Sequence, residues 1–592
     1  MQKDAITAEV LRRADAYLKQ SVLPVDYYRI RQRLAFPLNL KELTLPESIV
    51  SGIAVYPWAT WYAWALEERI ACLGWAAQWT GRVQYQEAAA SDLAMLASWP
   101  RYRQYEMPDL CSAHFSRILW MAGHHWTWLD GALREALTKA RARLAGEIIP
   151  LHRARLGEAF SRETILQGEK PHYAVANIPF IGAIGAALAA SGVEQEHLKR
   201  DLKILLDFWL EMRDNGLSEG VCYDGYVLDF LTDWFTCLPP GERAELLDDV
   251  RWSVLFSESL QTSAPGDLLQ VAPIGDIEPL EMPFHVGALA KLQLLQQEAL
   301  ASESSQRRWY FENIDFCALR ADALAALSAL PPDVQSAVPP VEVCHAQYAL
   351  TLRSGWEASD VAVVVAASNS LMGHVPANYG SLCIGSVGKW LIQTPGYQQY
   401  IPNSEREFTI GKTSRNTPIR GNNGVSLKAG HVLEKQSCDL VQSAVFDLTD
   451  CYAVTGQANS VTRSVFLTTQ QDISMVLVED QIGPSTEENL EYYWHGHPEA
   501  AWWAQDGWAM LTLNGRTLWF TSPQFAIDGT HIQRLRGSRG QLSLAISFLS
   551  SLDKNLKPPE MVQWLFIFQD EFPGSVEPII QRLNKLKKAG DS

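Results

Sequence analysis

The sequence has no hydrophobic run long enough to cross a bilayer. Its most apolar stretch, residues 178–193, falls short of the roughly 20 residues that a membrane-spanning helix needs. Basic charge is also scarce, because 67 acidic residues against 50 basic ones give a net charge of −17. This balance opposes binding to the phosphates of nucleic acids and to anionic membrane surfaces. We therefore expect neither a nucleic acid nor a membrane as a partner.

Paired cysteine motifs are absent as well. The nine cysteines are scattered, and none stands in a CxxC pair, which argues against a zinc ribbon or a redox motif. Residues 1–20 carry charges throughout and lack the apolar core of a secretory signal. Free thiols fit a reducing compartment, so we expect a cytoplasmic protein. No GxSxG, P-loop or GxGxxG fingerprint appears, and no cofactor is expected.

Aromatic residues, in contrast, are abundant, with 21 tryptophans among 592 residues. A chain of this length is expected to form more than one domain. Up to about Leu330 the segments are long and rich in Ala, Leu and Trp, with apolar residues three or four apart, as in residues 61–81 and 197–216. This spacing predicts successive helical hairpins, arranged as an α/α barrel or solenoid.

After a proline-rich joint at residues 330–342 the pattern changes. Short segments alternate apolar and polar residues or run β-branched, and turn residues separate them, as in residues 348–356 and 562–570. Such segments are typical of an antiparallel β-sandwich. We therefore predict a helical domain over residues 1–335 and a β-sandwich over residues 336–592.

Two tyrosines stand out in the segment 218–230, SEGVCYDGYVLDF. Tyr223 and Tyr226 are three residues apart, so on a helix they share one face. A tyrosine acts as a general acid or base when a nearby cation or amide lowers its pKa from about 10. The alternative is that both tyrosines line the core of a helical barrel, which is the more common situation.

Polar groups also open the apolar, small-residue segment 169–191. His172 and Asn177 lie at its start, where side chains often face a cleft. A buried His or Asn that satisfies backbone groups is an equally common alternative.

The segment 373–424 concentrates polar, aromatic and cationic side chains on predicted loops of the sandwich. It contains His374 and Tyr397, followed by Arg406 and Arg415. Loops on a rigid scaffold often bind ligands, so this density is typical of a binding edge, with a purely structural loop as the alternative.

In their order, these pieces resemble the heparinase II/III superfamily of polysaccharide lyases, which includes the oligoalginate lyases. The family has an incomplete (α/α) toroid followed by an antiparallel β-sandwich. Five segments carry the resemblance: DLCSAHFSRILWMAGHHWTWLDGALREALTKA, PHYAVANIPFIGAIGAALA, GLSEGVCYDGYVLDF, RSGWEASDVAVVVAASNSLMGHVPANYGSLCIGSVGKWLIQTPGYQQY and RNTPIRGNNG.

The resemblance implies cleavage of acidic oligosaccharides by β-elimination. His374 and either Tyr223 or Tyr226 would be the acid and base, and Asn177 or His172 would sit at the uronate carboxylate. The acid–base pair would remove the proton at C5 and protonate the departing glycosidic oxygen, once the carboxylate has been neutralised. Further substrate contacts are expected from Glu219, Tyr397, Arg406 and Arg415.

Three positions depart from the motifs of the family. Pro376, Asn378 and Thr394 stand where the family pattern has a second histidine, an aspartate and an acidic residue. Some of these positions bind zinc in relatives that contain it, and proline and threonine cannot replace imidazole and carboxylate as ligands. We therefore predict no metal at this site.

Two alternatives remain open. A glycoside hydrolase on the same scaffold would use paired carboxylates, with Glu219, Asp224 and Asp276 as candidates. A non-catalytic sugar-binding protein would keep only the Trp-rich groove. An acidic oligosaccharide is the expected partner in the lyase interpretation, and a homo-oligomer is compatible with the sequence.

Overall fold

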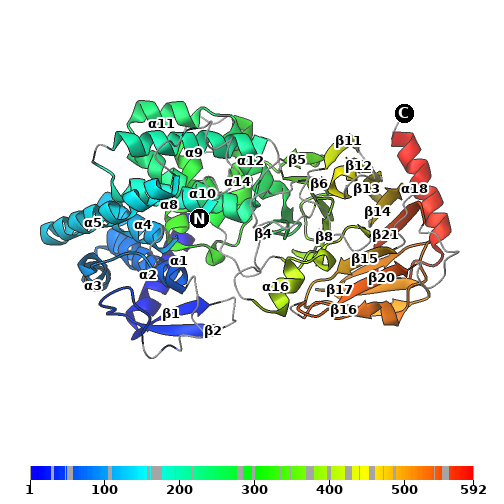
Figure 1. Cartoon of the computed structure of the whole chain (residues 1–592), viewed down its shortest axis with the longest axis horizontal. Helices are drawn as coiled ribbons and strands as arrows, with labels where there is room; N and C mark the ends of the chain where they lie inside the picture. The colour runs from blue at the N-terminus through cyan, green and yellow to red at the C-terminus, as the bar shows by residue number, and fades with distance from the viewer. Residues whose placement is uncertain are drawn as a thin grey trace. The chain divides into compact units, whose positions relative to one another are not determined.

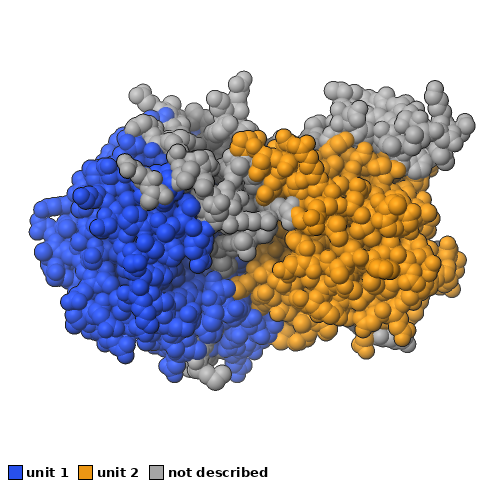
Figure 2. All heavy atoms as spheres, turned by 90° about the horizontal axis from the view of Figure 1, so that it is seen from below, with its two compact units in different colours: residues 1–211, 222–252, 282–337 blue, residues 212–221, 253–281, 338–592 orange. Residues whose placement is uncertain are grey.

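The computed structural model of the chain describes residues 2–27, 32–46, 49, 58–104, 110–156, 161, 177–193, 195–214, 218–275, 284–296, 301–331, 335–346, 348–367, 379–396, 402–420, 430–438, 441–452, 460–470, 472–483, 489–538, 540–549 and 559–590. No helix within these ranges combines the length and the apolar character needed to cross a membrane. The chain divides into two compact units (Figure 2). Unit 1 comprises residues 1–211, 222–252 and 282–337, and unit 2 comprises residues 212–221, 253–281 and 338–592.

Unit 1 is built mainly from helices (Figure 1). Its elements in chain order are α1 (Gln2–Leu18), β1 (Val22–Tyr27), β2 (Gln32–Pro37), α2 (Trp58–Thr80), α3 (Val83–Ser98), α4 (Leu110–His125), α5 (Gly131–Leu156), α8 (Asn177–Ala189), most of α9 (Glu196–Asp214), α10 (Val221–Cys237), α11 (Pro240–Leu247), α13 (Phe284–Leu295), α14 (Ala301–Glu312), η2 (Phe316–Ala318) and α15 (Ala321–Ala329).

Helix α2 is apolar on nearly every face, which is typical of a helix surrounded by others. It packs against α1, α3, α4 and α15, while α4 also packs against α5 and α8. The helix ends where Gly81 adopts a positive φ of 67°, a conformation that costs glycine little.

Glycines allow two close approaches between helices of unit 1. A Cβ on Gly185 of α8 would lie 2.6 Å from the Cα of Ala113 in α4. A Cβ on Gly225 of α10 would lie 2.4 Å from the Cβ of His285 in α13. The absence of a side chain at these positions lets the helices touch backbone to backbone.

A strand hairpin occurs near the N-terminus, in the region where the sequence pattern predicts only helices. Strands β1 and β2 pair in antiparallel fashion. Leu23, Val25 and Phe36 are buried, so the period of two is present but extends over few residues. A short hairpin gives too few repeats to be recognised beside long helical segments.

Unit 2 contains most of the strands, and all of its strand pairs are antiparallel. An eight-stranded sheet has the order β11-β12-β13-β14-β21-β18-β17-β16, a five-stranded sheet the order β5-β6-β7-β8-β9, and a four-stranded sheet the order β10-β15-β20-β19, with β3-β4 as a separate pair.

The strands of unit 2 are β3 (Ser263–Ala264), β4 (Asp267–Val271), β5 (Cys344–Ala346), β6 (Ala349–Arg353), β7 (Ala362–Ala366), β8 (Leu382–Ser386), β9 (Lys389–Ile392), β10 (Ile419–Arg420), β11 (His431–Cys438), β12 (Val441–Asp447), β13 (Val461–Gln470), β14 (Ile473–Ile482), β15 (Asn489–His495), β16 (Ala501–Gln505), β17 (Trp508–Leu513), β18 (Arg516–Thr521), β19 (Ile532–Gln533), β20 (Ser543–Leu549) and β21 (Met561–Phe568). Its helices are most of α12 (Arg251–Gln261), then α16 (Ser404–Thr409), η3 (Lys412–Ser414), α17 (Thr449–Tyr452), η4 (Gly529–His531) and α18 (Val576–Gly590).

The eight-stranded sheet buries both of its faces. Val465 of β13 and Val476 of β14 belong to a core shared with strands of the five-stranded and four-stranded sheets. Phe466 and Leu477, one residue further along each strand, pack instead with Leu583 of α18. Successive side chains of a strand point to opposite faces, so these strands are apolar on both sides.

The order of the two regions agrees with the sequence prediction. A helical region precedes a region of antiparallel sheets, as the change of hydrophobic period near residues 330–342 predicted. The change of period therefore identified the fold class at this level.

Candidate active site

Helix α10 contains both tyrosines that the sequence pattern singled out. Tyr223 and Tyr226 lie about one turn apart on this helix, as their spacing predicted, and both side chains are buried. Their shared position on a buried helix makes the surroundings of each hydroxyl decisive for its chemistry.

The hydroxyl of Tyr226 belongs to a buried hydrogen-bond cluster. It contacts Nε2 of His114 in α4, and Nε1 of Trp64 in α2 donates to it over 3.2 Å. The indole Nε1 of Trp64 is also 2.5 Å from Nε2 of His114. The ring of Phe284 covers the cluster, with its centroid 4.5 Å from that of Tyr226.

Glu67 of α2 holds the opposite edge of the His114 ring. Its Oε2 lies 2.5 Å from Nδ1 of His114. Burial would raise the pKa of Glu67, but Arg320, His114 and Arg117 lower it to about 2. Glu67 is therefore ionised at neutral pH.

His114 is the central group of this chain of contacts. Burial lowers its pKa, and the opposing effect of Glu67 does not restore it. A neutral imidazole beside an ionised carboxylate donates from Nδ1, which leaves Nε2 as the acceptor for Tyr226. The arrangement is a carboxylate, an imidazole and a phenol connected in series.

Further charges surround Glu67. The guanidinium of Arg320 pairs with it directly, and Nη1 of Arg117 lies 3.6 Å from its Oε1. Arg117 also forms ion pairs of 2.6 Å with both Asp229 and Asp233 of α10. Buried charges need such partners, because an unpaired ion in an apolar interior is strongly unfavourable.

The surroundings of Tyr226 oppose its use as a base. Burial raises its pKa well above the usual value of 10, so the phenol stays protonated. Its oxygen accepts from Trp64 and its proton is directed to His114. Of the two predicted tyrosines, Tyr226 therefore has the features of a structural group.

Asn177 is the first residue of α8 and is almost completely buried. Its Oδ1 accepts a hydrogen bond of 3.2 Å from Nε1 of Trp209. Within the part of the chain that the structure describes, its Nδ2 has no hydrogen-bond partner. A buried amide with a free N–H donor is unusual and can serve a ligand oxygen.

Several predicted site residues lie outside the described residues. These are His374, His172 and Tyr397, together with Pro376 and Asn378 of the same family block. Their roles remain predictions.

A buried ion pair anchors the start of β8, shortly after the position of His374. Arg463 pairs with Asp480 at 2.7 Å and also donates to the carbonyl oxygens of Gly380 and Asn416. The amide of Asn416 in turn donates to the carbonyl of Leu382 over 2.8 Å. The backbone beside this segment is therefore firmly held.

The other predicted substrate contacts occupy different surroundings in unit 2. Arg406 is half-buried in α16, whereas Arg415 is buried and one of its Nη atoms donates to the carbonyl of Thr409. Glu219 is buried as well. None of these three side chains is fully exposed to solvent. A role for them in substrate binding remains a prediction.

Thr394 stands where the family pattern has an acidic residue. Its hydroxyl donates to the backbone carbonyl of Pro273, so it serves a structural contact. In the described ranges, no group of three or more His, Cys, Asp or Glu side chains is arranged to hold a metal ion.

The residues that surround Tyr226 are not among those predicted from the sequence. Glu67, His114 and Arg117 lie on α2 and α4, far from α10 in sequence. A local signal existed, because the charged run Glu67–Arg69 interrupts a mostly apolar helix and His114 and Arg117 share a helical face. Ionisable residues in apolar helices are rarely left without partners.

Comparison with known proteins rests on structure alone. The sequence matches no family profile. It also matches no curated protein. A mutant of the heparan sulfate lyase HepC from Pedobacter heparinus matches 95% of this chain and 83% of its own, with a TM-score of 0.52 and 12% identity. The chain has the heparinase fold.

A second match supports the same fold. Heparinase III, the BT4657 gene product, covers 94% of this chain and 88% of its own with a TM-score of 0.50 and 12% identity. The resemblance indicated by the sequence motifs is thus confirmed at the level of the fold, and the chain is a divergent example of the heparinase fold. A structural match at such low sequence identity establishes the fold but not the chemistry of the chain.

Proposed function

We propose that the chain is a lyase that cleaves acidic, uronate-containing oligosaccharides by β-elimination. The observation that carries the proposal is the heparinase fold, which extends over 95% of the chain and includes both the helical and the sheet regions. Two of the matched structures are of a heparan sulfate lyase, and an acidic saccharide is the corresponding substrate class.

The reaction needs three groups. One neutralises the uronate carboxylate, because otherwise the proton at C5 is too weakly acidic to be removed. A base removes that proton, and an acid protonates the glycosidic oxygen as the bond to C4 breaks. The products are a new reducing end and a 4,5-unsaturated uronate.

Asn177 is our candidate for the carboxylate. Its Nδ2 has no acceptor within the described ranges, and its Oδ1 is fixed by Trp209. An amide oriented in this way can donate to a carboxylate without reorganisation. His172 is the second candidate for this role.

Tyr223 and His374 are our candidates for the acid and base. Tyr226 shares the helix with Tyr223 but has both hydrogen-bonding functions of its hydroxyl occupied, which favours Tyr223. Glu219, Tyr397, Arg406 and Arg415 are proposed contacts along the oligosaccharide.

The proposed architecture is an incomplete (α/α) toroid over residues 1–335 and an antiparallel β-sandwich over residues 336–592. A cytoplasmic location, expected from the scattered cysteines, would favour short oligosaccharides over polymers.

Matched tyrosine variants test the residue assignment. We expect Tyr223→Phe to lower the rate of appearance of near-ultraviolet absorbance by roughly 100-fold or more, since it removes an acid–base group. Tyr226→Phe should keep the rate within about tenfold and should instead lower the free energy of unfolding by about 1–2 kcal/mol.

The substrates for this test are short uronate oligosaccharides, with heparan and alginate fragments assayed in parallel. His374→Ala is the second catalytic variant and should behave like Tyr223→Phe. If Tyr226→Phe abolished turnover while Tyr223→Phe did not, the assignment of roles within α10 would be reversed.

A further inference from the structure

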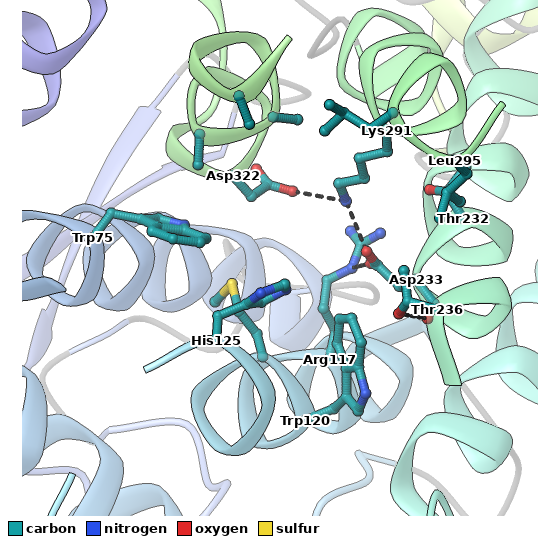
Figure 3. A pocket seen from close by; sticks show the side chains of 15 residues that line it. Trp75, Arg117, Trp120, His125, Thr232, Asp233, Thr236, Lys291, Leu295 and Asp322 are labelled. Atoms are coloured by element: carbon teal, nitrogen blue, oxygen red, sulfur yellow. Dashed lines mark hydrogen bonds and ion pairs between the residues drawn. The ribbon is translucent and has the colours of Figure 1, made fainter. Parts of the chain in front are cut away.

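Unit 1 contains a cavity of about 250 Å³ to which no predicted site residue contributes (Figure 3). Its lining comes from five helices, namely α2, α4, α10, α13 and α15. Ligand sites in proteins are usually concave, mostly apolar and equipped with a few polar groups, with volumes of about 300–1,000 Å³. This cavity is slightly smaller than that range and suits one ring, not a chain of sugars.

Aromatic side chains form one side of the cavity. In Figure 3, Trp75 and His125 lie below Asp322 in the view, and Trp120 lies below Arg117. The ring centroid of His125 is 5.3 Å from that of Trp75 and 5.5 Å from that of Trp120. Flat rings of this kind offer a large apolar surface for stacking.

Polar groups are concentrated on the other side. Nζ of Lys291 lies 3.1 Å from Oδ1 of Asp233 and 3.3 Å from Oδ2 of Asp322, and both carboxylates line the cavity with it. Lys291 also pairs with Asp229 at 2.9 Å. The three N–H donors of Lys291 are thus directed to three carboxylates, and a ligand in the cavity would meet the carboxylate oxygens of Asp233 and Asp322 as acceptors.

The charges of this polar side select the ligand. A carboxylate placed against it would face Asp233 and Asp322, and an ammonium group would face Lys291 and Arg117, which also lines the cavity. In a poorly solvated site such like-charge contacts are unfavourable. A hydroxyl group carries no charge and can donate to the oxygens of both carboxylates.

The geometry points to a binding site for a single uncharged sugar ring, stacked on Trp75 and Trp120 with its hydroxyl groups directed to Asp233 and Asp322. The site differs from the proposed cleavage site both in its residues and in its preference for an uncharged ligand. The inference does not depend on the lyase proposal.

Three pyranosides that differ at one substituent provide the test. Methyl glucoside, methyl glucuronide and the methyl glycoside of glucosamine supply a neutral, an anionic and a cationic ring, and the galacto and manno series repeat the comparison. Isothermal titration of the full chain should show that a neutral member binds at least tenfold more tightly than its charged analogues.

Two variants locate the binding. Trp75→Ala removes a stacking surface and should weaken binding at least tenfold. Ala329→Trp adds a large side chain to the exposed last residue of α15, which lines the cavity, and should abolish binding without disturbing the buried ion pairs. Trp503→Ala, at a tryptophan that is 62% exposed in β16, is the control and should leave affinity unchanged.

Three results would overturn the inference. The first is that no neutral pyranoside binds, and the second is that a charged analogue binds as tightly as the neutral one or more tightly. The third is that neither Trp75→Ala nor Ala329→Trp weakens binding although both variants keep the wild-type melting temperature. Lyase activity is scored separately, and both cavity variants should keep it. Loss of cleavage in the wild type would thus count against the proposed function alone.

Discussion

The hydroxyl of Tyr226 accepts from Trp64 and contacts His114, whose opposite nitrogen is fixed by Glu67. Each group fixes the protonation state of the next. The ionised Glu67 orders the imidazole, and the imidazole orders the phenol. At the scale of single residues, the apolar interior of unit 1 therefore contains a connected polar network.

Removing the carboxylate of Glu67 should strongly destabilise the protein. Glu67→Gln removes the carboxylate that pairs directly with the buried guanidinium of Arg320, and breaking such a buried pair costs about 3–5 kcal/mol. Denaturant unfolding measures the change. Glu135→Gln removes one partner of a pair in which both side chains are 68% exposed, and this control should change stability by less than about 1 kcal/mol.

Acid should remove the contribution of Glu67 at a defined pH. Its folded-state pKa of about 2 is below the usual 4.5, so its stabilising effect is fully present above pH 4.5 and is lost as the pH falls toward 2. This lowering of the pKa corresponds to a contribution of roughly 3 kcal/mol to the free energy of unfolding. The stability advantage of the wild type over Glu67→Gln should shrink across this window, and an advantage that stayed constant would contradict the assignment.

At the scale of elements, unit 1 depends on helices that touch through glycine. Helix α10 meets α13 at Gly225, where a Cβ would lie 2.4 Å from the Cβ of His285. The same helix carries Tyr223, Tyr226 and the carboxylates that pair with Arg117. A shift of α10 would therefore disturb both the buried network and the candidate acid–base group.

A single methyl group should report on this contact. Gly225→Ala forces α10 away from α13 and should lower the free energy of unfolding by about 1–3 kcal/mol. Gly146→Ala in α5 is the matched control, because no atom lies within 4 Å of its added Cβ. Helix propensity predicts that this control is neutral or stabilising by up to about 1 kcal/mol. Equal effects of the two changes in thermal and denaturant unfolding would contradict the close contact.

At the scale of the whole molecule, hydrophobic periodicity predicted the order of a helical and a sheet region. It also predicted that Tyr223 and Tyr226 lie on one helix. It could not reveal Glu67 and His114 beside Tyr226, because these contacts join residues 47 and 112 positions apart and leave no local spacing. The hairpin of β1 and β2 was missed because its alternation is too short to stand out.

The central claim is that the chain breaks glycosidic bonds by elimination. Its most direct test is product analysis by mass spectrometry after incubation with uronate oligosaccharides in water enriched in heavy oxygen. Elimination predicts unsaturated products that are lighter than hydrolysis products by one water and contain no solvent oxygen. Saturated products with one heavy oxygen atom would contradict the claim and identify a hydrolase.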